Sequence, residues 1–257
     1  MIIQKTFSKK IIAMLFVALL SLGNIQKISA TVFADENLRY EIVYHWGIIW
    51  KHAATASLSI RSVGTNYKAA LCAQTVSWAD KVYRVRDTLS CTISKNGLRP
   101  QRYVKAAHEG KHFGVDIVDY DYSGTMTTGK CTRIRKDSPI QKVSLQAHGP
   151  AYDMLSVFYL LRTLDFDSLS RNKVYRTTVF SGKKKERIDI KYAGIEDIKL
   201  RDDSKHKAYH IKFTFTQDGQ TKSSDDMGTW ISIDERRIPL MLRGKLPIGE
   251  VRCYYAK

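Results

Sequence analysis

The sequence predicts a mainly β protein whose long antiparallel sheet is strongly curved, like a roll or a barrel, with one α-helix near 150–164. Three observations lead to this prediction. Apolar and polar residues alternate with a period of two along most of the chain, as in half-buried strands. Glycine-containing pairs typical of turns separate these runs. One stretch, 150–164, instead repeats apolar residues every three or four positions. Because strands do not alternate with helices, a doubly wound or α/β barrel fold is excluded.

Residues 82–94 form the clearest predicted strand. Its apolar face carries Tyr83, Val85, Leu89, Cys91 and Ile93. Its polar face carries Arg84, Arg86, Thr88, Ser90 and Thr92. Residues 207–216 alternate in the same way. Hairpin turns are predicted at Asn96-Gly97, Ser123-Gly124, Ser181-Gly182 and Asp218-Gly219.

The predicted helix begins at Pro150, a residue that suits the first helical turn, and ends before the polar run that starts at Asp165. Asp153 and Ser156 are interpreted as polar residues of the helix N-terminus. A catalytic pair of Ser156 with His148 is not supported, because nothing in the sequence brings the two side chains together.

The N-terminus has the pattern of a secretory signal peptide over residues 1–30. Residues 1–10 are basic without an acid, residues 11–23 are apolar, and small residues precede a cleavage site after Ala30. A second cleavage site after Ala34 stays open. The apolar run is too short to span a bilayer, which takes about 20 helical residues.

The remaining residues, 31–257, are predicted to form one exported domain in the periplasm. No linker, internal repeat or low-complexity tract divides them. No later stretch is long and apolar enough to span a membrane as a helix, so we do not expect an integral membrane protein.

The chain is strongly basic, with 42 Lys and Arg against 25 Asp and Glu and a formal net charge of +17. Gly (15) and Pro (5) are too scarce for a collagen-like or disordered chain. Export excludes nucleic acid as the natural partner. The expected partners are a lipid, a lipoprotein or an anionic glycan of the envelope, with solubility alone as the alternative. The run Lys183-Lys184-Lys185 is predicted at a hairpin turn, and a second basic cluster lies between Arg171 and Arg176.

Four cysteines lie in the predicted mature chain, where thiols can oxidise: Cys72, Cys91, Cys131 and Cys253. Four cysteines allow three pairings, and all three stay open. A hairpin that turns near Asp80-Lys81 favours Cys72 with Cys91, which leaves Cys131 with Cys253. The alternative is four buried thiols. The spacing does not support a zinc ribbon or a thioredoxin-like site.

Residues 108–112 read His-Glu-Gly-Lys-His, a literal match to the H-E-x-x-H pattern of zinc proteases. That chemistry needs a helix, but Gly110 disfavours one and the flanks alternate as strands. We therefore interpret His108, Glu109 and His112 as a chance match on a hairpin and expect no metal and no cofactor. The sequence has no G-x-S-x-G elbow, P-loop or G-x-G-x-x-G, and we assign no catalytic residue.

The candidate ligand-binding residues are aromatic and arginine side chains. They are Trp46, Trp50, Tyr152, Tyr159, Arg162, Trp230, Arg236 and Arg237. Most of the aromatic residues are expected in the core, and some could line a barrel mouth. Arg236 and Arg237 are placed on a strand, where they face opposite sides and one pairs with Asp234, Glu235 or Asp153. The alternative is a structural ion pair or a strand-end turn.

Three stretches resemble one known family. They are a first strand at 36–47, the helix at 152–162, and Trp230 to Pro239 followed by Pro247 to Val251. Together these resemble the bacterial domain-of-unknown-function family 3108, over nearly all of the mature chain. The resemblance implies an exported protein of Gram-negative bacteria with a mostly antiparallel β fold. The family has no established reaction, so no site residue is carried over.

The leading functional hypothesis is a non-enzymatic binding or carrier module of the cell envelope, with an apolar or glycan ligand. The competing hypotheses are an envelope glycan hydrolase and a protein-binding scaffold. A carrier needs a cavity of roughly 300–1,000 Å³. A hydrolase needs two carboxylates about 5–10 Å apart in a cleft. A scaffold would expose an apolar patch.

Overall fold

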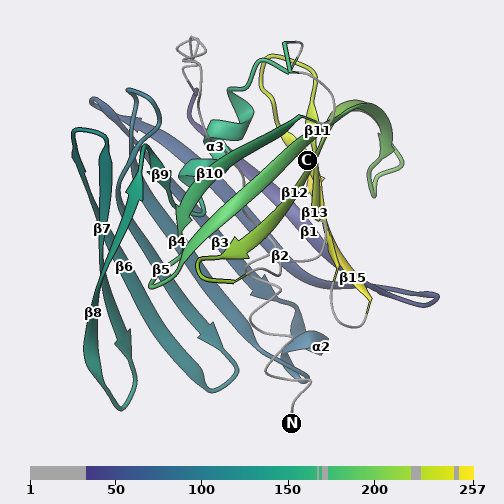
Figure 1. Cartoon of the computed structure of the whole chain (residues 1–257). Coiled ribbons are helices and arrows are strands. Elements are labelled where there is room, and N and C mark those ends of the chain that lie inside the picture. Colours follow the sequence, from purple (N-terminus) through teal and green to yellow (C-terminus); the bar gives the residue numbers. More distant parts are fainter. Residues whose placement is uncertain (1–32, 167, 170–172, 221–226, 246–248) are drawn as a thin grey trace.

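The computed structural model describes residues 33–257, apart from 167, 170–172, 221–226 and 246–248 (Figure 1). The predicted signal peptide and part of the basic cluster at 171–176 lie outside the described residues. The described chain forms one 15-stranded sheet in the order β8-β7-β6-β5-β4-β3-β2-β1-β15-β14-β13-β12-β11-β10-β9. The predicted class, a long and strongly curved antiparallel sheet, is confirmed.

The sheet consists of two antiparallel meanders that are joined where β1 pairs with β15. The first meander contains β1 (Glu36–Trp46), β2 (Ile49–Val63), β3 (Asn66–Thr75), β4 (Val85–Ser94), β5 (Pro100–Glu109), β6 (His112–Ser123), β7 (Met126–Arg135) and β8 (Ser138–His148). The second contains β10 (Val174–Phe180), β11 (Lys185–Lys199), β12 (Lys205–Gln217), β13 (Met227–Ser232), β14 (Pro239–Lys245) and β15 (Glu250–Ala256). The short β9 (Ala151–Tyr152) runs parallel to β10.

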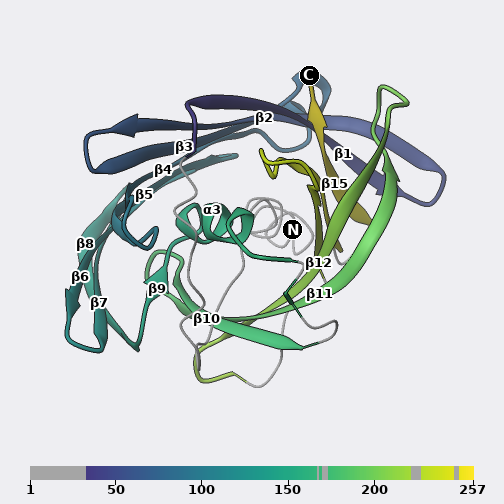
Figure 2. The ribbon, with the colours of Figure 1, turned by 90° about the horizontal axis from the view of Figure 1, so that it is seen from above.

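The sheet curls until its two ends come close together (Figure 2). Side-chain packing closes the seam between them. Gly129 of β7 lies against Phe180 of β10, and a Cβ atom at position 129 would be only 2.5 Å from the Phe180 ring. Tyr120 of β6 stacks on Phe180 with ring centroids 5.7 Å apart. The Tyr120 hydroxyl also donates a hydrogen bond to the Tyr152 carbonyl at 3.1 Å. A glycine is needed at 129 because the two walls approach so closely there.

The predicted helix is present inside the barrel as α3 (Ser156–Arg162), and all seven of its residues are buried (Figure 2). It is shorter than predicted, because the chain after Pro150 first forms β9. Asp153 starts the helix: its Oδ1 accepts hydrogen bonds from the N–H groups of Leu155 at 2.7 Å and Ser156 at 3.1 Å. The Ser156 hydroxyl accepts one from the Asp153 N–H at 2.9 Å. This reciprocal capping agrees with the interpretation of both residues as helix N-terminal.

Arg162, at the end of α3, is 2% exposed and ties the helix to one end of the barrel. Its guanidinium forms an ion pair with the carboxylate of Glu36 at the start of β1. Its Nε and Nη2 groups donate to the carbonyl oxygens of Arg237 at 2.9 Å and Arg236 at 2.8 Å. Three elements far apart in the sequence therefore meet at one side chain.

Arg236 and Arg237 do not lie on a strand, which corrects their predicted placement. They belong to the turn between β13 and β14, where Arg237 has a φ of 49°. The turn forms because the Asp234 carboxylate accepts the Arg236 N–H at 3.0 Å, a local bond that replaces strand pairing. The Arg237 guanidinium lies 4.6 Å from the ring of Tyr209. The turn thus uses the backbone carbonyls of the two arginines to hold Arg162.

The β11–β12 hairpin folds over the outside of the sheet. β11 has an irregularity at Gly194, whose φ is 114°. At the tip of the hairpin, Arg201 forms an ion pair with Glu41 of β1 at 2.7 Å, past the three strands β13, β14 and β15. His210 and Trp230 stack 4.2 Å apart on the outer face and are both 4% exposed. Trp230 therefore belongs to a small outer cluster and not to the barrel interior.

All four cysteines are free in the structure, and the favoured pairing of Cys72 with Cys91 is not formed. Cys72 is exposed and Cys91 is buried. Their partners on the neighbouring strand show why: Cys72 lies opposite Thr88, and Cys91 lies opposite Ala69. An odd offset between the two cysteines puts them on opposite faces of the sheet. The Cys91 thiol instead donates a hydrogen bond to the Asp153 carboxylate at 2.8 Å.

We expect Arg162→Met to lower the free energy of unfolding by about 3–5 kcal/mol, because it leaves the Glu36 carboxylate and two carbonyl groups without their buried partner. Urea denaturation monitored by circular dichroism measures the change. Arg176→Met is the control, since the Arg176 side chain is 50% exposed and its pair with Asp189 is worth less than about 1 kcal/mol. Equal losses in the two variants would contradict the assigned role of Arg162.

Candidate functional site

A cavity of about 1330 Å³ occupies the end of the barrel opposite the Arg162 anchor. Its mouth is surrounded by the β3–β4 connection, which contains α2 (Ser77–Asp80), and by the β5–β6, β7–β8 and β10–β11 turns. Met154, which precedes α3, lies in the lining. The helix thus occupies one end of the barrel while the other end is open and large enough for a ligand.

The inner face of β4 to β7 changes from apolar to charged along the barrel. Neighbouring residues across these four strands form rows, and rows two residues apart share a face. The row beside α3 is Cys91, Tyr103, Val118 and Cys131. The next row, towards the cavity mouth, is Leu89, Lys105, Asp116 and Arg133. The third row is Asp87, Ala107, Gly114 and Arg135.

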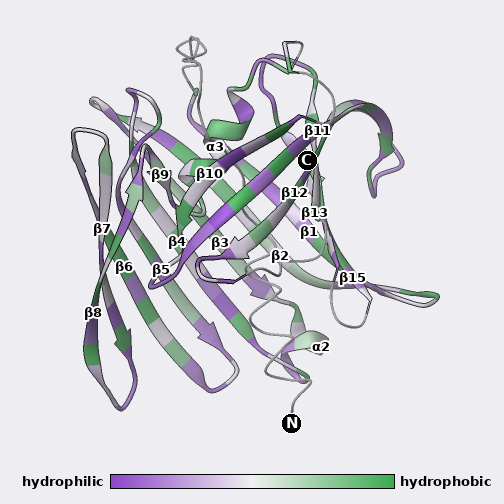
Figure 3. Ribbon diagram, viewed as in Figure 1, coloured by the Kyte–Doolittle hydropathy of each residue, from purple (hydrophilic) through white to green (hydrophobic). Residues whose placement is uncertain are grey.

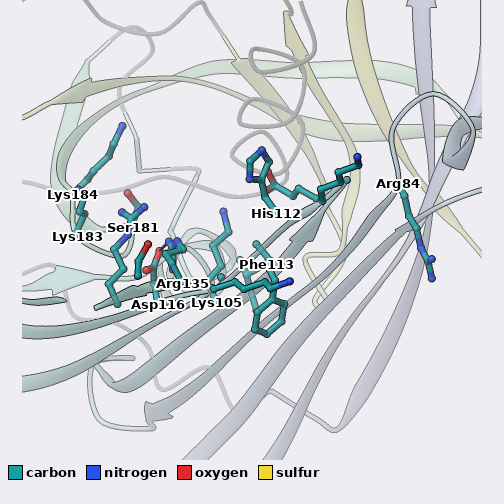
Figure 4. A pocket seen from close by; sticks show the side chains of 18 of the residues that line it. Arg84, Lys105, His112, Phe113, Asp116, Arg135, Ser181, Lys183 and Lys184 are labelled. Carbon is teal, nitrogen blue, oxygen red and sulfur yellow. Dashed lines mark hydrogen bonds and ion pairs between the residues drawn. The ribbon is translucent and has the colours of Figure 1, made fainter. Parts of the chain in front are cut away.

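Asp116 and Arg135 form the fixed ion pair of this wall (Figure 4). The Arg135 Nη2 group donates to Asp116 Oδ2 at 2.8 Å, and Nη1 donates to the Val115 carbonyl at 3.0 Å. A side chain at Gly114 would collide with the arginine, since a Cβ atom there would be 2.6 Å from its Nε. Asp116 Oδ1 is buried without a hydrogen-bond partner among the described residues. Because Oδ1 is buried and Oδ2 is held by Arg135, the pair fixes the shape of this wall.

Asp87 is a second buried carboxyl group next to the cavity wall and is 2% exposed. Its Oδ1 accepts the His108 N–H at 2.9 Å, while Oδ2 has no partner among the described residues. Burial raises the pKa of Asp87 to about 6, and the negative charge of Glu109 adds to the rise. The His108 N–H and the positive charge of Lys105 oppose it. Asp87 therefore gains a proton in mildly acidic solution.

Cations outnumber acids around the cavity. Eight basic side chains and five acidic ones line it. The basic ones are Arg84, Lys105, Lys111, Arg133, Arg135, Lys136, Lys183 and Lys184. Within the described part of the chain, Lys105 and Arg133 make no hydrogen bond or ion pair with another side chain, although each stands beside Asp116 in the register. A concave surface with unpaired cations attracts anions, and an arginine can bind a phosphate or carboxylate in a bidentate manner.

The H-E-x-x-H segment forms a hairpin turn, as interpreted from its glycine. Glu109 ends β5 and lies opposite His112, which begins β6, and Gly110 has a φ of 62°. His108 lies opposite Phe113, on the other face of the hairpin. The two histidines are therefore not one helical turn apart, as the protease geometry requires. Among the described residues, no group of three or more His, Cys, Asp and Glu side chains is arranged to hold a metal ion.

The structure does not gather the predicted ligand-binding residues into one site, and none of them lines the cavity. Trp46 and Trp50 lie at the tip of the β1–β2 hairpin and are about half exposed. Tyr152, Tyr159 and Arg162 are buried in the interior around α3, and the Tyr159 hydroxyl donates to the Ser59 carbonyl at 3.1 Å. The remaining three occupy the places described above, Trp230 on the outer face and Arg236 and Arg237 in the β13–β14 turn.

The charged residues of the cavity wall were missed because only the register between neighbouring strands brings them together. A usable signal exists: a charged residue at an apolar position of an alternating run. Asp87 stands between Val85 and Leu89, and Lys105 follows Tyr103 by two. The run Lys183-Lys184-Lys185 does lie at the β10–β11 turn, as predicted, and two of its lysines line the cavity (Figure 4).

The family described as protein of unknown function (DUF3108) has a sequence model that matches residues 39–255. The chain belongs to this family. Among solved structures, it is similar to the crystal structure of a β-barrel-like protein of domain of unknown function DUF1849 from Brucella abortus, with a TM-score of 0.63 and 12% identity. The match covers 87% of this chain and 96% of that chain.

At this identity the likeness shows a shared fold alone. No curated protein matches the sequence of this DUF3108 member. Among the residues that the structure describes, no helix is long and apolar enough to cross a membrane.

We expect Asp87→Asn to stabilise the protein at pH 8 and to leave its stability unchanged at pH 4. Between pH 4 and 6 the folded protein keeps a proton on Asp87 that the unfolded chain has released, so the wild type loses stability as the pH rises. The asparagine amide does not titrate, so the variant avoids this loss. Above pH 6 its free energy of unfolding should exceed that of the wild type by about 1–2 kcal/mol.

Urea denaturation at pH 4, 6 and 8 measures this pH dependence. The control is Asp119→Asn, which makes the same substitution at a side chain that is 47% exposed in its pair with Arg102. A difference between Asp87→Asn and wild type that is the same at all three pH values would show that Asp87 does not titrate as described.

Proposed function

We propose that this DUF3108 protein is an exported, non-enzymatic binding module of the cell envelope, and that it takes an anionic group of an envelope ligand into the open end of its barrel. The observation that carries the proposal is the charged row on the inner wall, in which Lys105 and Arg133 flank Asp116 without being paired. A wall that served only for packing would carry apolar residues there, as the neighbouring row does.

The chemistry of the wall favours a phosphate or carboxylate group on the ligand. Charge-assisted hydrogen bonds from lysine and arginine contribute about 1.5–3 kcal/mol each when they are shielded from water. A cavity lined by cationic side chains suits an anionic glycan better than a plain hydrocarbon chain.

Two sources in the envelope carry this chemistry, an anionic glycan and an anionic lipid headgroup. The predicted signal peptide and the basic charge of the chain support an envelope setting for either. The apolar floor, with Leu89, Tyr103 and Met154 in the lining, is small because α3 fills the far end. We therefore expect a glycan to bind more tightly than a lipid.

We expect isothermal titration calorimetry to show binding of an oligosaccharide that contains uronic acid, and no binding of a neutral oligosaccharide of equal length. Short-chain phosphatidylglycerol below its micelle concentration tests the lipid source. Lys105→Glu and Arg133→Glu should each weaken binding of the anionic ligand at least about tenfold, because each reverses a charge on the cavity wall.

The matched control is Lys142→Glu, which makes the same charge change at an exposed position of β8 that does not line the cavity. Equal binding of the neutral and anionic oligosaccharides, or equal loss in the control, would contradict the proposal. Release of new reducing ends during the titration would favour the glycan hydrolase instead.

A further inference from the structure

The tip of the β1–β2 hairpin gathers large apolar side chains in water. Trp46 is 55% exposed, Ile48 97%, Ile49 47% and Trp50 46%. Ten large apolar residues are prominently exposed in the described chain, and four of them lie in this one turn. Gly47, with a φ of 57°, allows the turn to be tight. The hairpin projects beyond the rest of the sheet at the lower right of Figure 1, and Figure 3 shows hydrophobic residues at its end.

The base of this hairpin is ordered by contacts between aromatic rings and cations. The His45 ring stacks on Trp50 with centroids 3.7 Å apart. The Arg252 guanidinium lies 4.6 Å from the Trp50 ring, and the Lys51 ammonium lies 3.9 Å from the ring of Trp78. Arg252 is also ion-paired with Glu250 at 2.6 Å, and the Lys51 ammonium supplies the positive charge behind the apolar tip.

We propose that this tryptophan tip, formed by residues 46–50, docks the protein onto the surface of an anionic lipid bilayer. Tryptophan is favoured at the boundary between lipid and water because its ring is apolar and its N–H is polar. The two isoleucines would enter the acyl region, where each gains from losing contact with water. Lys51 and Arg252 would remain at the level of the anionic headgroups.

The size and position of the tip favour a bilayer over a protein partner. A stable protein interface takes about 800 Å² from each side, more than one five-residue turn presents, whereas a bilayer admits a narrow apolar projection. Further exposed apolar side chains and lysines lie at the same end of the barrel, as docking onto an anionic bilayer requires. Val82 and Phe113, 63% and 48% exposed, lie beside the β3–β4 and β5–β6 turns at that end. The cavity-rim lysines lie at that end as well.

Co-sedimentation of the mature protein with vesicles tests the proposal. We expect binding to vesicles of phosphatidylethanolamine with phosphatidylglycerol, much weaker binding to phosphatidylcholine vesicles, and a decrease with added salt. Ile48→Asp should weaken binding to the anionic vesicles about tenfold or more. Ile48 is almost fully exposed, so its replacement leaves the fold intact, which circular dichroism verifies.

The matched control is Val63→Asp, at the other end of the same strand β2, where the side chain is 47% exposed. It should bind vesicles as the wild type does. Brominated lipids should quench the fluorescence of the wild type and lose this effect in the Trp46→Phe, Trp50→Phe double variant.

Three results would overturn the proposal. One is the absence of binding to both kinds of vesicle. Another is equal binding of the wild type and Ile48→Asp. The third is a wild-type dimer in size-exclusion chromatography that Ile48→Asp abolishes, with no vesicle binding by either protein. That result would make the tip an interface between two copies of the chain.

Discussion

The buried guanidinium of Arg162 is the contact on which the arrangement of this protein depends most. An unpaired charge in the interior would cost several kcal/mol, so every strong donor of the side chain needs a fixed acceptor. Glu36 and the carbonyl groups of Arg236 and Arg237 provide them from β1 and from the β13–β14 turn. Both meanders of the sheet are thereby tied to one short helix. Since α3 is held at that end, the opposite end of the barrel contains the cavity.

The inner face of the sheet differs between the helix end and the cavity end of the barrel. In the row nearer to α3 the strands present Cys91, Tyr103, Val118 and Cys131, which are all buried in the hydrophobic core. One pleat further on, the same strands present Lys105, Asp116 and Arg133, which require a polar cavity. The exposed tryptophan tip and the rim cations lie at this open end. The proposed envelope function and the proposed bilayer docking rest on these two features, the apolar projection and the basic cavity.

Local rules predicted much of the fold, and long-range contacts account for what they missed. The strand predicted at 82–94 is present as β4, three residues shorter at its start, and the turns at Gly97, Gly124 and Gly182 are present; these features required only local backbone preferences. The helix was predicted too long because β9 pairs with β10 far along the chain. The arginines of the β13–β14 turn were placed on a strand because a side-chain bond from Asp234 competes with sheet pairing. The cavity residues escaped prediction since only their positions on neighbouring strands bring them together.

The sequence alone determined the class of the fold, because the period of the hydrophobic pattern depends on adjacent residues and survives any global arrangement. It also determined that the H-E-x-x-H segment turns as a hairpin, because Gly110 and its alternating flanks act locally. Tertiary structure decided where the helix sits, that the four cysteines stay unpaired, and which charged residues share a cavity. Those outcomes depend on the register across strands and on the closure of the sheet. Register and closure are set by contacts such as Arg162 with Glu36, whose partners are separated by 126 positions in the chain.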